Sequence, residues 1–431
     1  METRSGWITK RLVHEVKSGG TFSSLAEPDF RWLWLGSLGS SFAMNMQIVA
    51  RGWLVYDLTS SAMDLAWVTM SFTLPQVLFS LWGGVIADRL PKRRIIAVAQ
   101  SLNFAATLIM ATIIITGRVE FWDFIWIGAF NGTVLALSMP ARQAFVPELV
   151  GEGRVFNAMA LNTASWNLSR ILGPTVAGGL IAMLAHGDTS STYGVGIVYY
   201  AIAGLYFISA ALVAFIRVQP RVVRSSEATV LNEIAAGFRY VVAHPPVLGL
   251  ILLSILPFLF GMPINTLLPA FNEDVLKGGP DSLGILLGSM GVGAIVGSLM
   301  LARLGGIRRK ARWLVATSIA WGGLMGGFAA TRELYAAALL MAAIGWVSAW
   351  NMSLNRGQLQ VIVAPEMRGR IMSIDMMSHG LMPLGIIPIS LIAERVSIPV
   401  ALASAGSMFV LAVLAVAMTR AVREIDRPAP R

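Results

Sequence analysis

The stretch Gly84-Val85-Ile86-Ala87-Asp88-Arg89-Leu90-Pro91-Lys92-Arg93-Arg94 joins the end of one apolar segment to the start of the next. Between Asp88 and Arg94 it combines a carboxylate, a proline and four basic side chains. This combination is unsuited to the interior of a membrane helix, but it fits a tight loop at an anionic membrane surface. We therefore interpret it as a charged connection between two membrane-spanning helices. An ordinary basic loop is the alternative, because any loop on the inner side of a membrane attracts Lys and Arg.

The composition is that of a membrane protein. The 431 residues are 56% hydrophobic and 13% charged, with a mean hydropathy of +0.69, whereas about a quarter of the residues in soluble domains are charged. The net charge of +10 would also suit nucleic-acid binding, but the basic residues lie in short loops between apolar segments. Lipid headgroups explain them better, so no nucleic-acid partner is expected. The absence of cysteine excludes disulfides, thiolate metal sites and cysteine nucleophiles.

Apolar segments long enough to cross a bilayer recur along the whole chain. A span needs about 20 residues to cross a hydrocarbon core of about 30 Å. Six such segments occupy residues 32–56, 65–87, 95–116, 121–139, 155–184 and 193–216. Six more occupy residues 247–271, 283–302, 313–330, 334–352, 371–392 and 399–418. We therefore expect an all-α membrane protein with twelve transmembrane helices in two six-helix bundles.

The Lys and Arg residues alternate between loops as the positive-inside rule requires for this number of spans. Most lie in loops on the side of the two termini. The opposite loops hold only Arg118, Lys277, Arg332 and Arg395. Both termini are therefore predicted to be cytoplasmic.

These assignments divide the chain into five segments. Residues 1–31 form a basic arm without the apolar core of a signal peptide, and residues 420–431 form a cytoplasmic tail. The two bundles occupy residues 32–216 and 247–419. The linker at 217–246 carries apolar residues at helical spacing, so we expect an amphipathic helix on the inner membrane surface or under the bundle. A simple spacer is the alternative.

Two short patterns recur between the halves. Gly84 and its basic loop recur as Gly297 followed by Arg303, Arg308, Arg309 and Lys310, and Pro147-Glu148 recurs as Pro365-Glu366. The halves therefore resemble copies of one six-helix unit. Leu301 stands where the second copy would carry Asp88, so the copies are not equivalent at this loop.

The stretch Gly84–Arg94 resembles the signature loop between helices 2 and 3 of the major facilitator superfamily, and the twelve expected spans agree with that superfamily. Four further strings resemble the branch that includes enterobactin exporters and related secretion and drug-efflux proteins. They are Trp53–Thr59, Pro140–Pro147, Arg170–Pro174 and Gly237–Val241. The resemblance implies secondary active transport, in which two bundles rock about a binding site at the middle of the membrane.

The resemblance also implies a gating role for the signature loop. Gly84 would allow close helix packing, and Asp88 would hold one conformation by interacting with the positive N-terminal end of a helix near Arg368–Ile371. Pro91 replaces the glycine usual at its position, which stiffens the turn. The cations that would hold the loop at the inner face are Arg89, Lys92 and Arg93.

A second motif, Gly173-Pro174, resembles the antiporter signature of exporters in the same superfamily. Pro174 removes a backbone hydrogen bond and the neighbouring glycines thin the helix, so we expect a bend and a close helix contact. Ala177 departs from the signature, which usually has a glycine there. A kinked packing helix with no influence on the direction of transport is the alternative.

Proton coupling by the usual route is in question, because Gly128 occupies the position where proton-coupled drug exporters usually carry an Arg. A charge in hydrocarbon is costly unless it is paired or solvated, so ionisable residues inside the spans are the substitutes. These candidates are Arg51, Arg170, Asp375 and His379, and Arg170, near the middle of its span, is the preferred anion-binding or proton-linked site. Asp375 and His379 are four residues apart and share a helix face, where they would relay a proton or form a structural hydrogen-bonded pair.

Amides and indoles near the middle of the spans are candidate walls for a large amphipathic substrate. They are Asn45, Gln47, Asn131, Asn162, Trp166, Trp346, Trp350 and Asn351. For each Trp, packing or a place in an interfacial belt is the alternative.

We expect a proton-coupled efflux carrier for a siderophore-like metabolite or an amphipathic drug, acting as a monomer in a bacterial inner membrane. An importer of a small organic anion is one alternative, and a non-transporting receptor or assembly factor on the same fold is another. No enzyme, cofactor or metal site is expected, because the four histidines are scattered and no GK[ST] nucleotide loop occurs. The expected partners are a small molecule, protons and the lipid bilayer.

Overall fold

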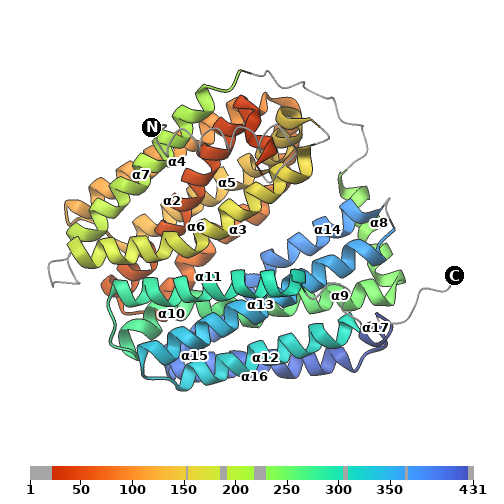
Figure 1. Ribbon diagram of the computed structural model, residues 1–431. Helices are drawn as coiled ribbons and strands as arrows, with labels where there is room; N and C mark the ends of the chain where they lie inside the picture. Colours follow the sequence, from red (N-terminus) through yellow and green to blue (C-terminus); the bar gives the residue numbers. More distant parts are fainter. Residues whose placement is uncertain are drawn as a thin grey trace, which may run out of the picture. The chain divides into compact units, whose positions relative to one another are not determined.

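The computed structural model describes residues 22–151, 154–184, 192–217, 230–303, 309–364 and 367–425 (Figure 1). Within these ranges every regular element is helical, so the predicted fold class is confirmed. Contacts group the described residues into two compact units. Unit 1 holds the residues up to Ala50 and those between Leu74 and Ser225, whereas unit 2 holds Arg51–Thr73 and the residues from Ser226 onward.

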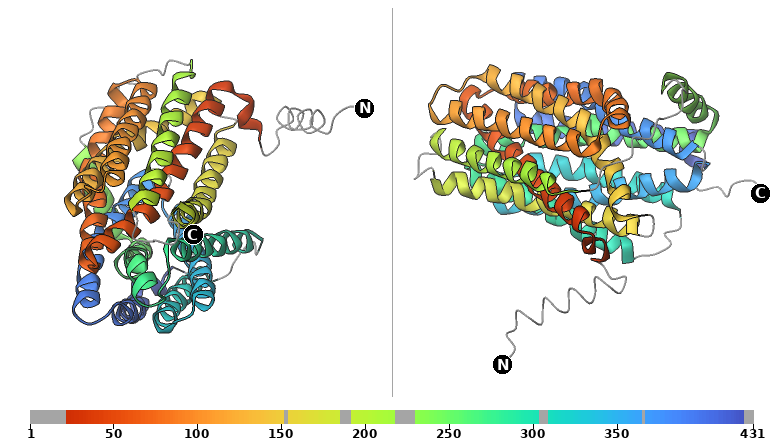
Figure 2. Two further views of the ribbon diagram at one scale, coloured as in Figure 1. Left: turned by 90° about the vertical axis from the view of Figure 1, so that its left-hand side faces the viewer. Right: turned by 90° about the horizontal axis from the view of Figure 1, so that it is seen from above.

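Unit 1 is a bundle of long helices (Figure 2). Its elements are η1 (Ser23–Ala26), α2 (Pro28–Thr59) as far as Ala50, α3 (Ala62–Arg89) from Leu74, α4 (Lys92–Ile115), α5 (Phe121–Val150), α6 (Val155–Leu184) and α7 (Thr192–Ala214). α5 and α7 each lie against both α4 and α6. Gly83 of α3 touches the backbone of Ala136 in α5 so closely that any side chain would clash. Membrane helices associate mainly by such close packing, so small residues hold this bundle together.

One end of unit 1 is closed by a hydrophobic cluster. Phe30 comes from the start of α2, Ile96 from the start of α4 and Phe145 from near the end of α5. Beside it, Arg154 forms an ion pair of 2.6 Å with Glu27. Because the helix ends that meet here adjoin the basic loops, we call this the basic end of unit 1.

Unit 2 contains Arg51–Thr73 of α2 and α3 together with the later helices. These are α8 (Val230–Ala243), α9 (Pro245–Leu256), the π-helical η3 (Pro257–Gly261), α10 (Pro263–Asp274), α11 (Pro280–Arg303), α12 (Lys310–Ala330), α13 (Leu334–Ile362), α14 (Arg368–Met377), the 3₁₀ turn η5 (Ser378–Leu381), α15 (Met382–Arg395), α16 (Ile398–Ala417) and α17 (Arg420–Arg423). α13 packs against α11 and α12, and α12 packs against α16. Gly293 and Gly345 bring the backbones of α11 and α13 into direct contact, as Gly83 does for α3 and α5.

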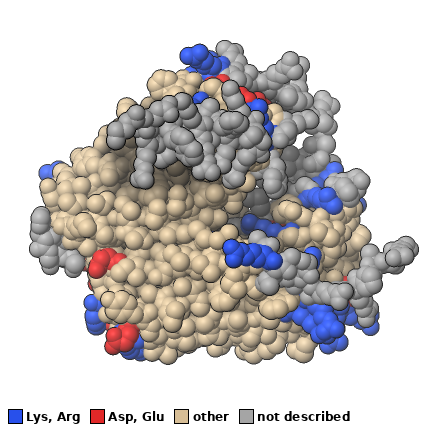
Figure 3. Space-filling view, in the orientation of Figure 1, with Lys and Arg blue, Asp and Glu red and all other residues tan. Residues whose placement is uncertain are grey.

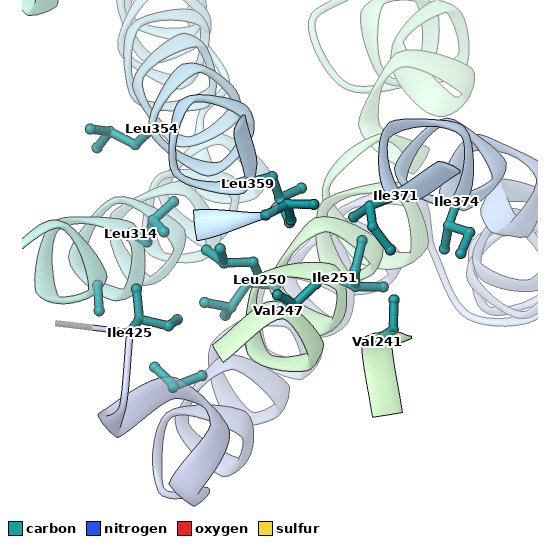
Figure 4. Close-up of a cluster of buried hydrophobic side chains, with 14 residues drawn as sticks. Val241, Val247, Leu250, Ile251, Leu314, Leu354, Leu359, Ile371, Ile374 and Ile425 are labelled. Carbon is teal, nitrogen blue, oxygen red and sulfur yellow. The ribbon is translucent and has the colours of Figure 1, made fainter. Parts of the chain in front are cut away.

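A second hydrophobic cluster closes one end of unit 2 (Figure 4). Val247 comes from the start of α9, Leu314 from the start of α12, Leu359 from the end of α13 and Ile371 from the start of α14. The adjoining segments carry basic residues, and Figure 3 shows Lys and Arg side chains gathered near α17. We call this the basic end of unit 2.

The opposite end of unit 2 is tied by side-chain carboxylates. The hydroxyl of Tyr56 in α2 donates a 2.5 Å hydrogen bond to Asp274 of α10. Glu394 of α15 accepts a 3.0 Å hydrogen bond from the backbone N–H of Ala62, the first residue of α3. A carboxylate at a helix start satisfies N–H groups that have no partner within the helix and interacts favourably with the helix dipole. These bonds hold Arg51–Thr73 in unit 2.

Nine helices in the described ranges are long and apolar enough to cross a membrane. The count of twelve stays a prediction, because α2 and α3 are long but not among the nine, and the predicted span 371–392 is divided into α14, η5 and α15. The division of the chain at 217–246 also stays a prediction. The helix expected in that linker is α8, which lies against α14. The terminal arm up to residue 21 and the tail after residue 425 lie outside the described residues.

Gly173 and Gly179 of α6 provide a matched pair for testing the packing. A β-carbon on Gly173 would lie 2.8 Å from the β-carbon of Asn45 in α2, whereas one on Gly179 would meet no described atom within 4 Å. We predict that Gly173→Leu lowers the free energy of unfolding by about 1–3 kcal/mol through overpacking. Gly179→Leu should have little effect on thermal unfolding in detergent. Equal melting temperatures for the two variants would contradict the close α2–α6 contact.

Candidate functional site

A buried carboxylate in unit 2 is the centre of the candidate site. Asp375 of α14 is 1% exposed. The hydroxyl of Ser254 in α9 donates a hydrogen bond to its Oδ1, and Nε of Arg356 in α13 lies 3.5 Å from its Oδ2. A carboxylate among membrane helices needs such partners, because neither lipid nor apolar side chains can solvate it. Three helices therefore converge on one ionisable group.

Two helix irregularities lie next to this group. α9 gives way to the π-helical η3 at Pro257, three residues after Ser254, and α14 ends at Met377, two residues after Asp375. Gly385 of α15 lies against the backbone of Leu259 in η3, where any side chain would clash. Single π-helical turns are frequent at functional sites, because they redirect side chains and release backbone groups.

A pocket in unit 2 adjoins the carboxylate. Its volume is about 10 Å³, which is about the space of one water molecule. Its walls are Ser254, Pro257, Phe258, Asn351, Met352, Asn355 and Arg356. Ser254 and Arg356 thus belong both to the pocket wall and to the surroundings of Asp375. The site therefore places an ionisable carboxylate beside a small space with partly polar walls, about the size of one water molecule.

Asn355 gives the pocket an unused hydrogen-bond acceptor. Its side chain is 3% exposed, and its Nδ2 donates to the carbonyl oxygen of Leu250 at 3.1 Å. Its Oδ1 is buried and has no hydrogen-bond partner among the described residues. Buried acceptors are nearly always satisfied, so this oxygen is a place for the donor of a ligand, a water molecule or a moving side chain.

The predicted relay between Asp375 and His379 loses its geometric basis. The four-residue spacing places both on one face only if the α-helix continues, but α14 ends at Met377 and His379 lies in η5. The His379 side chain lies outside the described part of the structure. The partners that the structure gives to Asp375 are Ser254 and Arg356, neither of which was a candidate from the sequence.

Two of the three cavity candidates on α13 serve as packing groups. The indole N–H of Trp350 donates to the carbonyl oxygen of Gly297 at 2.6 Å, and its ring centroid lies 6.0 Å from that of Trp346. The amide of Asn351 donates to Ser318 of α12 at 2.7 Å, although this residue also touches the pocket. Trp350 therefore packs at the α11–α13 contact, and a cavity role for Trp350 and for the 37% exposed Trp346 stays a prediction.

The cavity candidates of unit 1 differ in their surroundings. Asn45 is buried and donates to the carbonyl oxygen of Ser41 in its own helix. Gln47 and Asn131 are also buried, and Oδ1 of Asn131 has no partner among the described groups. Asn162 is half-buried, and Trp166 is exposed. Their role in binding stays a prediction.

The two intramembrane arginines occupy different surroundings. The Arg51 guanidinium lies 5.8 Å from the ring centroid of Phe72, over its face, which is a favourable position for a cation. Arg170 of α6 is half-buried and makes no hydrogen bond or ion pair with a described residue. Both stay candidates for coupling or anion binding.

The cations of the signature loop are tied to neighbouring helices of unit 1. Nζ of Lys92 forms a 2.7 Å ion pair with Glu148 of α5, and Nη2 of Arg93 donates to the carbonyl oxygen of Ala214 at the end of α7. The second contact places a positive charge at the negative end of a helix dipole. Arg89 is exposed. These contacts brace the basic end of unit 1.

Gly84 and Gly173 have different surroundings, and their gating roles stay predictions. A β-carbon on Gly84 would meet no described atom within 4 Å, and the close helix contact is made instead by the adjacent Gly83. Gly173 makes the expected close contact, and α6 continues as a helix through Pro174. The side chain of Asp88 lies outside the described residues, so its latch role stays a prediction.

The Lys92–Glu148 ion pair provides a test of the bracing. Lys92→Glu places two carboxylates together, so we predict a loss of about 2 kcal/mol in the free energy of unfolding. The double variant Lys92→Glu/Glu148→Lys should recover most of this loss, and Arg89→Glu should change little. Thermal unfolding in detergent measures all three. Failure of the double variant to recover would exclude a direct contribution from the pair.

Comparison with known proteins identifies the family to which the chain belongs. It is 24% identical to the staphyloferrin A transporter of Staphylococcus aureus, covering 84% of this chain and 86% of that protein. It is 23% identical to macrolide efflux protein A of Streptococcus pyogenes, covering 92% and 97%. The crystal structure of the nucleoside transporter NupG matches 90% of this chain and 98% of its own with a TM-score of 0.71 and 13% identity, which shows a shared fold. Residues 19–429 match the transmembrane secretion effector family, and the chain therefore belongs to this family of membrane transporters.

Proposed function

We propose that this transporter exports a siderophore-like metabolite or an amphipathic drug in exchange for protons, with Asp375 as the group that carries the proton. The observation that carries the proposal is the buried Asp375, which Ser254 and Arg356 stabilise beside a pocket. A carboxylate in such surroundings can exist in ionised and protonated forms without leaving the membrane region. The alternatives of anion import and of a non-transporting receptor are not favoured by the relatives' names.

The substrate class rests on the relatives and on the chemistry of the pocket. One relative is named for staphyloferrin A and another for macrolide efflux, so both handle large organic molecules. Here the pocket has apolar walls at Pro257, Phe258 and Met352, with amide groups between them. In this conformation the pocket has room for about one water molecule, whereas sites that bury a drug-sized ligand enclose about 300–1,000 Å³, so the relatives carry most of the argument.

The orientation follows from the charges. Each unit gathers basic residues at one end, and Lys and Arg favour the cytoplasmic side of a membrane. We therefore propose that both basic ends, and with them both termini, face the cytoplasm of a bacterium. Gating by Gly173, Pro174 and the signature loop belongs to the same proposal, with a monomer as the functional unit.

Asp375→Asn tests the proton-carrying role. The variant keeps the shape of the side chain but cannot release a proton, so accumulation driven by an imposed pH gradient should fall to that of protein-free liposomes. Counterflow exchange without a gradient should continue, because it needs only binding and conformational change. The measurement uses proteoliposomes and a panel of siderophores and dyes.

The exposed carboxylate Asp281 in the first turn of α11 supplies the control, since Asp281→Asn removes a charge far from any buried partner. Gradient-driven accumulation by Asp375→Asn equal to that of the unmodified protein would remove Asp375 from the mechanism. Absence of gradient-driven transport by the unmodified protein across the whole panel would overturn the export function itself.

A further inference from the structure

An arginine in unit 1 has no counter-charge within the described residues. Arg142 is half-buried in α5, eight residues before the end of that helix. Its Nη1 donates a 3.0 Å hydrogen bond to the hydroxyl of Ser40 in α2. No carboxylate in the described ranges forms an ion pair with Arg142, and its other N–H groups donate to no described acceptor. A guanidinium carries five N–H donors, so most of its binding capacity is unused.

Ser40 holds the guanidinium in place without neutralising it. Ser40 is 6% exposed, and its hydroxyl donates to the carbonyl oxygen of Ser37 at 3.2 Å. Because that bond uses the proton, the hydroxyl offers Arg142 only a lone pair. The positive charge of Arg142 therefore lies among membrane helices with only neutral hydrogen-bonding partners in the described part of the chain. A charge in this position is costly unless a group of opposite charge or water approaches it.

Gln100 of α4 lies at nearly the same depth as Arg142. The ion pair between Lys92 and Glu148 sets α4 and α5 side by side. From that pair, Gln100 lies eight residues along α4 and Arg142 six residues back along α5, which correspond to about 12 Å and about 9 Å. Gln100 is 1% exposed, and neither polar atom of its amide has a hydrogen-bond partner among the described residues. Buried amides are nearly always satisfied, so Gln100 indicates a group bound from outside the chain.

α7 contributes a polar group at the same level. The hydroxyl of Ser209 in α7 donates to the carbonyl oxygen of Gly36 in α2 at 2.7 Å, so these two helices are in contact. One turn further along α7, Tyr206 is 6% exposed and lies close enough to Arg142 to interact with its charge. Three helices therefore present uncharged polar side chains toward this level of unit 1, namely Ser40, Gln100 and Tyr206.

We propose that Arg142 is the centre of a binding site for a small monovalent anion, with chloride as the occupant. The guanidinium supplies the charge and several donors, and the amide N–H of Gln100 supplies a further donor. Water alone would satisfy these donors but would leave the charge uncompensated. The inference goes beyond the proposed export function and does not rest on it, because Arg142 belongs to unit 1 and Asp375 to unit 2.

The packing around this level favours a monatomic ion over an organic acid. A β-carbon on Gly36 would lie 3.2 Å from the backbone oxygen of Ser209, so α2 and α7 are closely apposed. One turn toward the basic end, Phe30, Ile96 and Phe145 pack together between α2, α4 and α5. Chloride at Arg142 is thus a structural ligand that joins the helices of unit 1, and it is not transported cargo.

Thermal unfolding of the purified protein in detergent tests the site. Chloride is exchanged for gluconate at constant ionic strength, because gluconate is too large to replace a buried halide. We expect chloride to raise the melting temperature by about 3 °C or more in a saturable manner, since it binds the folded state alone. Bromide should replace chloride. A melting temperature that does not depend on the anion would mean that water alone occupies the site, which would overturn the proposal.

Substitutions identify the residues that hold the anion. Arg142→Gln should abolish the chloride-dependent shift in melting temperature. Arg94→Gln is the matched control, because it removes the same charge from an exposed position at the start of α4, and it should keep the full shift. Gln100→Leu keeps the charge but removes one donor, so it should weaken chloride binding about tenfold. A full shift in Arg142→Gln, or a lost shift in Arg94→Gln, would overturn the assignment.

Line broadening of the chloride NMR signal measures binding directly on folded protein. The unmodified protein and Arg94→Gln should broaden the signal, bromide should reverse the broadening, and Arg142→Gln should not broaden it. No bromide-sensitive broadening by the unmodified protein would overturn the anion site even if gradient-driven transport is intact, and the export function would stand. Broadening that requires Arg142, without any gradient-driven transport, would support the anion site and count against the export function.

Discussion

Hydrocarbon offers no hydrogen bonds, so each polar group on a membrane helix must find a partner within the protein or face water. Several contacts in both units follow from this constraint. The amide of Asn351 bonds to α12, the indole of Trp350 bonds to a backbone carbonyl of α11, and Lys92 pairs with Glu148. Each of these groups fixes one helix against another. These polar side chains therefore serve mainly to hold one helix against another.

Asp375 differs from those groups because its partners are also the wall of a pocket. Ser254 sits just before a π-helical turn, and Arg356 reaches the carboxylate from a half-exposed position. The surrounding helices are interrupted at η3 and η5, while glycine contacts keep η3 and α15 in register. Helices held by a close glycine contact therefore surround the carboxylate and its two partners.

The helical class and Asp375 were predictable from the sequence, because they depend on hydropathy and on the rarity of charge in apolar segments. Arg356 could not be predicted as a site residue, because the predicted span 334–352 ends before it, whereas α13 continues to Ile362. The amides of Asn351 and Asn355, one helical turn apart, are the sequence signal that the polar face of this helix continues beyond the predicted span. Whether Gly83 or Gly84 makes the close helix contact depends on which side of α3 faces its neighbour. The packing role of Trp350 likewise depends on which side of α13 faces α11. Composition along one helix does not contain that information.

Glu394 links the contacts of α3 to the order in which the helices are synthesised. It completes the first turn of α3 from a position 332 residues later in the chain, and Asp274 receives the hydroxyl of Tyr56 across 218 residues. While the ribosome is still making the intervening spans, the start of α3 has none of these partners. The contacts within unit 1, such as that between Lys92 and Glu148, need no helix after α7. The early helices can thus assemble as the chain emerges, while Arg51–Thr73 reaches its final contacts only after α15 has been inserted.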